Sequence, residues 1–313
     1  MKTTRPQKQR FFLRVENFEV EINTDVAEYA RLVRFYLPSH VLTKHGQTAP
    51  AMRIDACRRR PETSEDPWGK DLGFLSELRR YGLAWRADMP RRCATVAIDD
   101  RKRLPVGLLY HGGFLFPLSL LLLPFRAALI HGGLISDGKR AVLVIGTSGV
   151  GKSTLAVSFN SAGFFCFTDE HALLRRGRGG VHGGRFLSRV ALPVLSMRNF
   201  KDQKTLFSWE SSIGKYFLKP AAQNLPVAAC RIDKIVFPRF ALSGPRRIHR
   251  LRPSEVFKRL LCDDYYYHSS SHLESYGRDH LNLFTDLAGS AAGYSLRYTP
   301  NDVRRIPELI GQL

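Results

Sequence analysis

The sequence is poor in cysteine and lacks any pair of cysteines with the spacing of a metal or redox motif. Its 313 residues contain five cysteines, an odd number, widely separated along the chain: Cys57, Cys93, Cys166, Cys230 and Cys262. Disulfide frameworks of short secreted chains use an even number, whereas zinc and thioredoxin-type sites use CxxC pairs. The pattern therefore predicts reduced thiols in a cytoplasmic protein and excludes a zinc site built on CxxC.

Long apolar runs are also missing. The most apolar stretch, residues 114–124, contains two prolines, and it is shorter than the roughly 20 residues that a membrane-spanning helix needs. The N-terminus is basic but is not followed by the apolar core of a signal peptide. We expect no membrane span. Residues 114–124 should form a buried helix packed on the sheet of the main domain, or alternatively a patch that faces a membrane or a partner.

Acidic residues are scarce relative to basic ones, with 28 Asp and Glu against 48 Lys and Arg, for a formal net charge of +20. Such a charge attracts polyanions, including nucleic acid, acidic peptides and nucleotides. The basic residues are spread along the chain in clusters at 2–10, 58–60, 101–103, 175–185 and 246–252. Because no RNA-binding aromatic signature, zinc-finger spacing or helix-turn-helix pattern accompanies them, the sequence favours an acidic peptide or protein partner, or a plain solubility charge, over nucleic acid.

One motif is specific. Residues 141–145 read AVLVI, a sequence typical of a buried strand. The next residues match the motif GxxxxGK[ST], and they are followed at 155–159 by a mixed run of apolar and polar residues that we expect to be helical. Strand, glycine-rich turn and helix are the context in which this motif binds phosphates through backbone N–H groups. The predicted nucleotide-binding residues are Gly146, Thr147, Ser148, Gly149, Val150, Gly151, Lys152, Ser153 and Thr154.

Two of these residues have separate predicted roles. The Lys152 ammonium would reach the β and γ phosphates, and the Ser153 hydroxyl would ligate Mg²⁺. No guanine-reading NKxD motif is present, so we expect ATP rather than GTP.

The residues flanking the loop add specificity. His131 stands 15 residues before Gly146, and Asp169 and Glu170 begin 17 residues after Lys152. A carboxylate at the end of a strand beside the loop can reach both a metal ion and an incoming hydroxyl. The alternative for Asp169 and Glu170 is a solvated strand end or helix cap, and for His131 a turn residue.

The run 131–174, HGGLISDGKRAVLVIGTSGVGKSTLAVSFNSAGFFCFTDEHALL, resembles the catalytic core of the HPr serine kinase family. The resemblance implies an α/β fold similar to phosphoenolpyruvate carboxykinase and transfer of the γ-phosphoryl group of ATP to a hydroxyl. It implies that Asp169 takes the proton of the acceptor, that Glu170 helps to hold Mg²⁺ with Ser153 and Asp169, and that His131 lies beside the phosphates. Relatives also place a lysine near the site, for which Lys215 is the candidate, with Arg198 behind it.

The sequence departs from the family pattern at two places, and both bear on the expected metal ligand and substrate. Glu170 stands where the family has aspartate, and the Gly- and Arg-rich stretch 175–185 contains no glutamate. The signature that accompanies phosphorolysis is thus incomplete, which argues against HPr as the substrate. In size and architecture the chain is similar to kinases that phosphorylate a serine of lasso peptide precursors.

The sequence predicts two parts, an α+β, mostly β N-terminal region over residues 1–103 and a catalytic α/β domain over 104–313. Alternation at 11–23, 51–56, 83–87 and 93–98 predicts strands, and spacing at 25–36 predicts a helix capped by Asp25. The glycine-rich stretch 177–184 is either a lid over substrate or a surface hairpin. Homo-oligomers are compatible with the family resemblance.

The leading hypothesis is an ATP- and Mg²⁺-dependent kinase acting on a serine-type hydroxyl of a peptide or protein, with Asp169, His131, Lys152 and Lys215 as catalytic residues. Three alternatives stay open: a small-molecule kinase for free serine or a sugar, a nucleotide-binding regulator without catalysis, and a nucleic-acid-stimulated ATPase.

Overall fold

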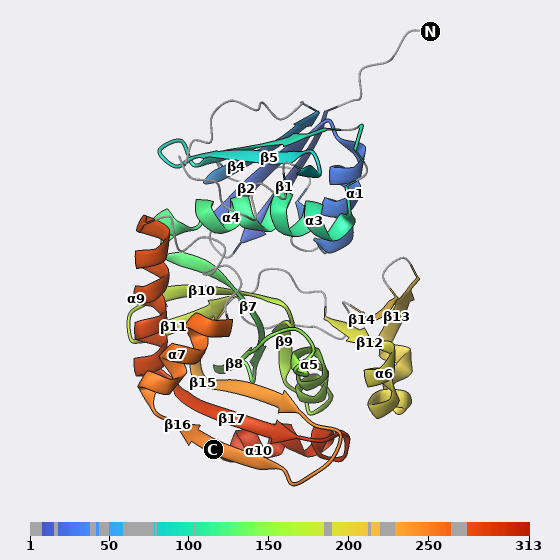
Figure 1. Cartoon of the computed structure of the whole chain (residues 1–313), viewed down its shortest axis with the longest axis vertical. Helices are drawn as coiled ribbons and strands as arrows, with labels where there is room; N and C mark the ends of the chain where they lie inside the picture. The colour runs from blue at the N-terminus through green and yellow to red at the C-terminus, as the bar shows by residue number, and fades with distance from the viewer. Residues whose placement is uncertain are drawn as a thin grey trace. The chain divides into compact units, whose positions relative to one another are not determined.

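The structure, a computed structural model, is mixed α/β with several sheets (Figure 1). It describes residues 8–15, 18–37, 42–43, 50–58, 78, 80–99, 101–102, 104–184, 190–211, 214–219, 229–263 and 274–313. The chain divides into two compact units, Met1–Pro124 and Phe125–Leu313. The sequence-based division at 103/104 differs from this one by the segment 104–124.

The first unit is built on a six-stranded sheet with strand order β3-β1-β2-β4-β6-β5. The strands are β1 (Gln9–Val15), β2 (Phe18–Thr24), β3 (Leu42–Thr43), β4 (Met52–Arg58), β5 (Leu83–Asp88) and β6 (Cys93–Ile98). Each strand expected from alternation is confirmed, because one face of the sheet is buried and the period of two follows from that burial. Residues 16–17, between β1 and β2, lie outside the described residues.

Helix α1 (Ala27–Tyr36) confirms the expected helix but not its cap. Its N-cap is Val26, and no side chain caps it. The Asp25 carboxylate instead accepts a hydrogen bond from the backbone N–H of Arg58 at 3.0 Å. Asp25 therefore makes a tertiary contact in place of the helix cap expected from local sequence.

The apolar segment forms a continuous helical stretch of α3 (Val106–Tyr110), η1 (His111–Leu115), α4 (Phe116–Leu121) and η2 (Leu123–Phe125). It is buried as expected, but α4 packs on β4, β5 and β6 of the first unit, with the Phe116 and Trp85 ring centroids 5.3 Å apart. The expectation that it packs on the sheet of the main domain was wrong. Among the residues that the structure describes, Val106–Phe125 is long and apolar enough by length and composition to cross a bilayer, and most of it is buried within the fold.

The second unit contains an eight-stranded sheet with the order β11-β10-β7-β8-β15-β17-β16, in which β9 also pairs with β7. The strands are β7 (Ala127–Ser136), β8 (Arg140–Ile145), β9 (Phe165–Thr168), β10 (His171–Gly177), β11 (Gly180–Gly184), β15 (Ala229–Phe240), β16 (Arg247–Leu251) and β17 (Ala292–Tyr298). Strand β11 pairs with both β10 and β15, so β7, β8, β15, β11 and β10 form a closed ring of neighbours.

Strand direction brings several chain turns to one edge of this sheet. Strands β8, β15 and β17 are mutually parallel, and β9 and β8 are both antiparallel to β7. The carboxyl ends of β8, β9, β15 and β17 therefore share an edge, the place where α/β sheets most often bind ligands.

Helices cover both faces of the sheet (Figure 1). Helices α7 (Pro253–Asp263) and α9 (Glu274–Ser290) pack on one face, and α5 (Lys152–Ser161) and α10 (Ile306–Gln312) pack on the other. The core under α7 and α9 includes Leu143, Ile235, Leu260, Phe284 and Leu287. The core under α5 and α10 includes Val144, Leu155, Phe159, Leu296 and Ile310.

A smaller sheet with the order β12-β14-β13 packs into the core under α5 and α10. It consists of β12 (Ala191–Pro193), β14 (Lys215–Leu218) and β13 (Phe207–Glu210), with α6 (Val194–Met197) and η3 (Arg198–Leu206) between β12 and β13. The glycine-rich stretch 177–184 forms the hairpin of β10 and β11, which is the second of the two structures expected for it.

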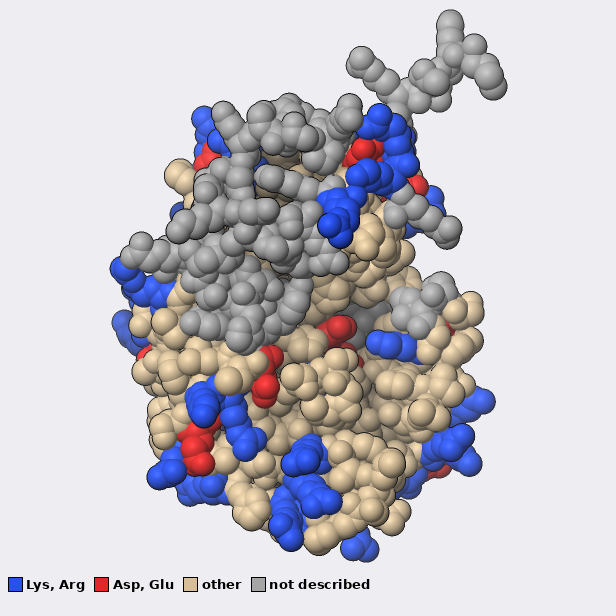
Figure 2. All heavy atoms as spheres, viewed as in Figure 1, with Lys and Arg blue, Asp and Glu red and all other residues tan. Residues whose placement is uncertain are grey.

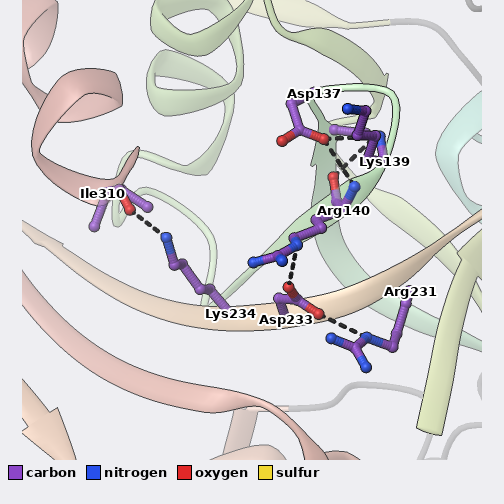
Figure 3. Close-up of polar contacts among 8 residues, drawn as sticks. Asp137, Lys139, Arg140, Arg231, Asp233, Lys234 and Ile310 are labelled. Atoms are coloured by element: carbon purple, nitrogen blue, oxygen red, sulfur yellow. Dashed lines mark hydrogen bonds and ion pairs between the residues drawn. The ribbon is translucent and has the colours of Figure 1, made fainter. Parts of the chain in front are cut away.

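The edge of the main sheet opposite the shared carboxyl ends is held by ionic contacts (Figure 3). The Asp137 carboxylate accepts hydrogen bonds from the backbone N–H groups of Lys139 and Arg140, both at 2.8 Å, which fixes the turn from β7 to β8. Asp233 on β15 contacts the guanidinium groups of Arg140 at 3.1 Å and Arg231 at 2.8 Å. The parallel pairing of β8 and β15 is thereby fixed at the end where the strands begin.

Candidate active site

The glycine-rich loop, residues 146–151, runs from the end of β8 to the start of α5. Gly149 and Gly151 have φ angles of 86° and 102°, which L side chains rarely adopt. At Gly149 an added Cβ would meet nothing within 4 Å, whereas at Gly151 it would lie 2.0 Å from Tyr298 Oη. The loop thus leaves open space at Gly149 and is tightly packed at Gly151.

The ends of two neighbouring strands, β17 and β15, hold the loop through hydrogen bonds. The Tyr298 hydroxyl at the end of β17 donates a hydrogen bond to the Gly151 carbonyl at 3.0 Å. The backbone N–H of Phe240 at the end of β15 donates to the Val150 carbonyl at 3.3 Å. These two bonds occupy carbonyl groups of the loop and none of its N–H groups.

Helix α5 begins directly behind the loop. Its N-cap is Gly151, and no side chain caps the helix. The first N–H groups of a helix have no intrahelical acceptor, and together with the helix dipole they favour an anion. The end of the loop is accordingly suited to a phosphate.

Lys152 is buried and folds back over the loop, donating to the carbonyls of Gly146 at 2.6 Å and Thr147 at 3.0 Å. Burial lowers the pKa of its ammonium group, while the carboxylates of Glu170, Asp169 and Asp263 act in the opposite direction. One cation and three acidic groups therefore lie within electrostatic range at the carboxyl edge of the sheet.

Asp169 follows the last residue of β9 and is 3% exposed. Its Oδ2 accepts a hydrogen bond from the Ala191 N–H at 3.2 Å. Its Oδ1 is buried and has no hydrogen-bond partner among the described residues. A buried carboxylate oxygen without a donor is costly, and such groups call for a proton, a cation or a ligand.

Burial is the main cause of a raised pKa at Asp169, which stands at about 7, and the neighbouring Glu170 charge adds to it. The Ser153 hydroxyl, the Ala191 N–H and the Lys215 ammonium act in the lowering direction. The sequence placed Ser153, Lys215 and Asp169 in one site, and the structure brings all three within interacting range.

The turn that carries Glu170 is shaped by Thr168, whose hydroxyl oxygen accepts hydrogen bonds from the N–H groups of Glu170 at 3.2 Å and His171 at 3.1 Å. The Glu170 side chain is 43% exposed, and its Oε2 lies 3.8 Å from His171 Nε2. Glu170 thus borders the buried Asp169 on the solvent side.

His131 lies on β7 at the level of the loop, because the next residue, Gly132, pairs with Ile145 at the end of β8. It also faces His171 across the ladder of β7 and β10, with ring centroids 5.9 Å apart. The Gly132 N–H donates to the Glu170 carbonyl at 2.9 Å. The acidic turn is therefore hydrogen-bonded to β7 directly after His131.

Arg198 is the one predicted neighbour that stands apart. It is exposed at the start of η3, and among the described residues no contact is seen between its guanidinium and Lys152, Asp169 or Glu170. The nearby Ser196 is closer, since its hydroxyl oxygen accepts a hydrogen bond from the Thr154 hydroxyl at 3.2 Å.

Sequence reasoning missed two residues of this site. Tyr298 gave no signal, because its role depends on the pairing of β17 with β15. Asp263 belongs to an acidic pair at 263–264 to which the sequence assigns no role; the structure places it at the end of α7, where it acts on Lys152. Residue 264 lies outside the described residues.

The donor set fits a small divalent cation. The Ser153 hydroxyl and the carboxylates of Asp169 and Glu170 are hard oxygen ligands of the kind that Mg²⁺ prefers. The buried Asp169 Oδ1, which lacks a donor within the described part of the chain, is the specific observation that a cation would satisfy.

No protein-family model and no curated protein matches this chain. Among solved structures, the HPr(Ser) kinase/phosphatase from Coxiella burnetii is similar over 59% of this chain and 92% of its own, with 13% sequence identity and a TM-score of 0.28. A likeness at this level does not establish family or reaction, so the functional proposal rests on the geometry of the site.

Proposed function

We propose that this protein is an ATP- and Mg²⁺-dependent kinase that transfers the γ-phosphoryl group to a serine-type hydroxyl of a peptide or protein. The observation that supports it best is the convergence of a loop suited to phosphate, the Lys152 ammonium and the buried Asp169 carboxylate at one edge of the sheet. Phosphoryl transfer needs little covalent chemistry from the protein beyond cations at the phosphates and a group that accepts the proton of the nucleophile.

The glycine-rich loop would act as a phosphate-binding loop. The N–H groups of residues 149–154 would hold the phosphate oxygens, with the positive end of α5 behind them. Lys152 now bonds two loop carbonyls, and a phosphate would compete for the same ammonium. Binding of the triphosphate therefore exchanges neutral acceptors for charged ones.

In the transfer step, the acceptor oxygen forms a bond to the γ-phosphorus while the bond from that phosphorus to the β–γ bridging oxygen breaks. The electron pair of the broken bond remains on ADP. The proton of the acceptor hydroxyl passes to the Asp169 carboxylate, which lies at the carboxyl end of β9, on the same edge of the sheet as the glycine-rich loop.

Ser153, Asp169 and Glu170 would hold Mg²⁺, which supplies charge neutralisation of the β and γ phosphate oxygens when bound. His131 would hydrogen-bond to the transferring group from β7. Lys215 acts electrostatically on Asp169 and would stabilise charge that develops on the transferring phosphoryl group.

The peptide acceptor is supported by two features, the excess of basic residues over acidic ones and the resemblance in architecture to kinases encoded with lasso peptide precursors. A precursor peptide of a ribosomal natural product is the acceptor that this resemblance favours. Free serine and sugars are the small-molecule acceptors to compare with it.

The test is transfer from γ-labelled ATP, with Mg²⁺, to a panel of acidic serine peptides and to free serine, using the native chain and Asp169→Asn. We expect labelled phosphoserine with the native chain and a loss of about 10²–10⁴-fold with the variant, while the Kd for ATP stays within a few-fold. If the native chain binds ATP but labels no acceptor, and partner binding is the same in both proteins, the protein is a nucleotide-dependent regulator. Stimulation of ATP turnover by RNA or DNA would instead support a nucleic-acid-dependent ATPase.

A further inference from the structure

Large apolar side chains are exposed at one end of the small sheet β12-β14-β13. Val194 is 49% exposed, Leu195 71% and Trp209 48%; these three residues are called the distal patch below. Neighbouring exposed apolar side chains of this size are uncommon on a protein surface and mark interaction sites.

Strand register shows that the three residues lie at the same end of that sheet. Trp209, Tyr216 and Leu192 form one cross-strand row, and Pro193, Lys215 and Glu210 form the next. From Pro193 the chain passes directly into Val194 and Leu195. The Trp209 and Tyr216 ring centroids are 4.9 Å apart, so the indole packs against the aromatic ring of its cross-strand partner.

The same segment contacts the candidate active site. The Ala191 N–H donates to Asp169 Oδ2 at 3.2 Å, and the Thr154 hydroxyl on α5 donates to Ser196 at 3.2 Å. Lys215, in the row beside the patch, acts on the Asp169 carboxylate. A chain whose hydroxyl reaches Asp169 would therefore have this segment next to it.

Charge in the segment favours an acidic occupant. Within residues 190–211 and 214–219 there are five Lys and Arg and two Asp and Glu, which leaves an excess of three positive charges. The basic residues are Arg198, Lys201, Lys204, Lys215 and Lys219. A ligand that satisfies both features carries carboxylates together with large apolar groups.

We propose that the distal patch binds the residues flanking the acceptor hydroxyl, and that the acceptor is an acidic peptide with a large apolar or aromatic side chain within a few residues of the phosphorylated serine. This inference rests on the kinase activity proposed above and adds the sequence class that the kinase selects. Val194, Leu195 and Trp209 would be specificity-determining residues, and Asp169 would act on whichever hydroxyl they position.

The experiment uses two synthetic acidic peptides of the same length and charge, with one central serine flanked either by Leu and Phe or by Gly and Asn. Steady-state kinetics are measured with the native chain, with Leu195→Glu and Trp209→Ala, and with Leu242→Glu as the matched control. Leu242 is 87% exposed in the connection between β15 and β16, so the control introduces the same charge outside the distal patch, and the KM for ATP reports any effect on the glycine-rich loop. Thermal unfolding and the KM for ATP show whether each variant is folded and binds nucleotide.

With the native chain and Leu242→Glu we expect the apolar peptide to have a KM about 10-fold lower than the polar one, since burial of one large side chain supplies an effect of this size. Leu195→Glu and Trp209→Ala should remove most of that preference while the KM for ATP stays the same. Equal preference in all four proteins would overturn the inference.

Two further outcomes separate this inference from the proposed function. If the native chain phosphorylates free serine or both peptides without preference, the kinase assignment stands and the inference is overturned. If the native chain transfers no phosphate to any acceptor, the proposed function fails and the inference fails with it. A concentration-dependent dimer that Leu195→Glu abolishes, with peptide kinetics unchanged, would show that the patch joins two copies of the chain.

Discussion

At the scale of single residues, the protonation state of Asp169 affects the free energy of unfolding of the protein. Burial and the neighbouring Glu170 charge raise the pKa of this carboxyl to about 7, above the 3.9 typical of an unfolded chain. The folded state therefore retains the proton more tightly than the unfolded state. The contribution of this residue to stability is complete below about pH 4 and is lost as the pH rises toward 7.

Because the contribution of Asp169 to stability falls as the pH rises, it predicts how Asp169→Asn changes the stability of the metal-free protein. At pH 8 the native chain must bury an ionised carboxylate, which costs on the order of 4 kcal/mol for a shift of three pKa units, and the amide does not. We expect the variant to exceed the native chain in free energy of unfolding at pH 8 and to differ from it much less at pH 5. Urea denaturation at both pH values in the presence of a chelator measures this difference, and an equal gap at the two pH values would contradict it.

Lys215 gives a second prediction at this scale. It is exposed and acts on Asp169, and no hydrogen bond to its ammonium is seen among the described residues, so its effect is screened by solvent. Lys215→Met should lower kcat by roughly 10-fold, less than the loss of a buried charge-stabilising donor, and leave the Kd for ATP unchanged. Lys219→Met is the matched control, because the Lys219 ammonium donates to the Thr205 carbonyl. Equal effects of the two substitutions on kcat would show that Lys215 has no specific role in the site.

At the scale of elements, the glycine-rich loop depends on strands distant in sequence. A Cβ at Gly151 would lie 2.0 Å from Tyr298 Oη, whereas one at Gly149 would meet nothing within 4 Å. Both residues have positive φ. They therefore share the conformational cost of a side chain and differ only in packing.

A double-mutant cycle separates these two costs. Gly149→Ala should destabilise by about 1–2 kcal/mol through conformation alone, and Gly151→Ala should destabilise by more because of the clash. Tyr298→Phe removes the bond to the Gly151 carbonyl, worth about 1 kcal/mol, and should reduce the extra cost of Gly151→Ala. Free energies of unfolding of the single and double variants test this, and strictly additive effects would show that Tyr298 does not set the position of the loop.

Several elements follow from local pattern, and the exceptions have tertiary causes. The strand predicted over 141–145, observed as β8 (Arg140–Ile145), and the helix after Lys152 were readable, since each depends on neighbours within a few residues. The cap at Asp25 and the packing of residues 106–125 were not, because a backbone N–H from β4 and the first-unit sheet decide them. Apolarity predicts burial of a segment but not which sheet buries it.

At the scale of the whole molecule, the net charge of +20 acts at long range. Figure 2 shows Lys and Arg dispersed over the visible face with acidic groups among them. A dispersed positive field raises the encounter rate with any acidic chain without selecting its sequence. Selection would then depend on short-range contacts near Asp169.

The corresponding prediction is a salt effect that depends on the acceptor. For an acidic serine peptide, kcat/KM should fall several-fold between about 0.05 and 0.3 M NaCl, because the Debye length shortens over this range. A peptide with Asn and Gln in place of Asp and Glu should respond much less. Steady-state rates at saturating ATP measure this, and an equal salt effect on both peptides would show that the positive charge does not act on the acceptor.

The sequence by itself determined which groups the candidate site contains: a glycine-rich loop between a strand and a helix, a lysine, a serine and an acidic pair at fixed spacing, since each depends on a short segment with its own conformational preferences. Tertiary structure alone decided that β8 and β9 pair with the same strand, β7, and end at the same edge, that the Ala191 N–H bonds Asp169, and that Tyr298 and Asp263 lie near that edge. Those contacts join residues far apart in the chain, and strand order and direction, which no local pattern encodes, bring them together.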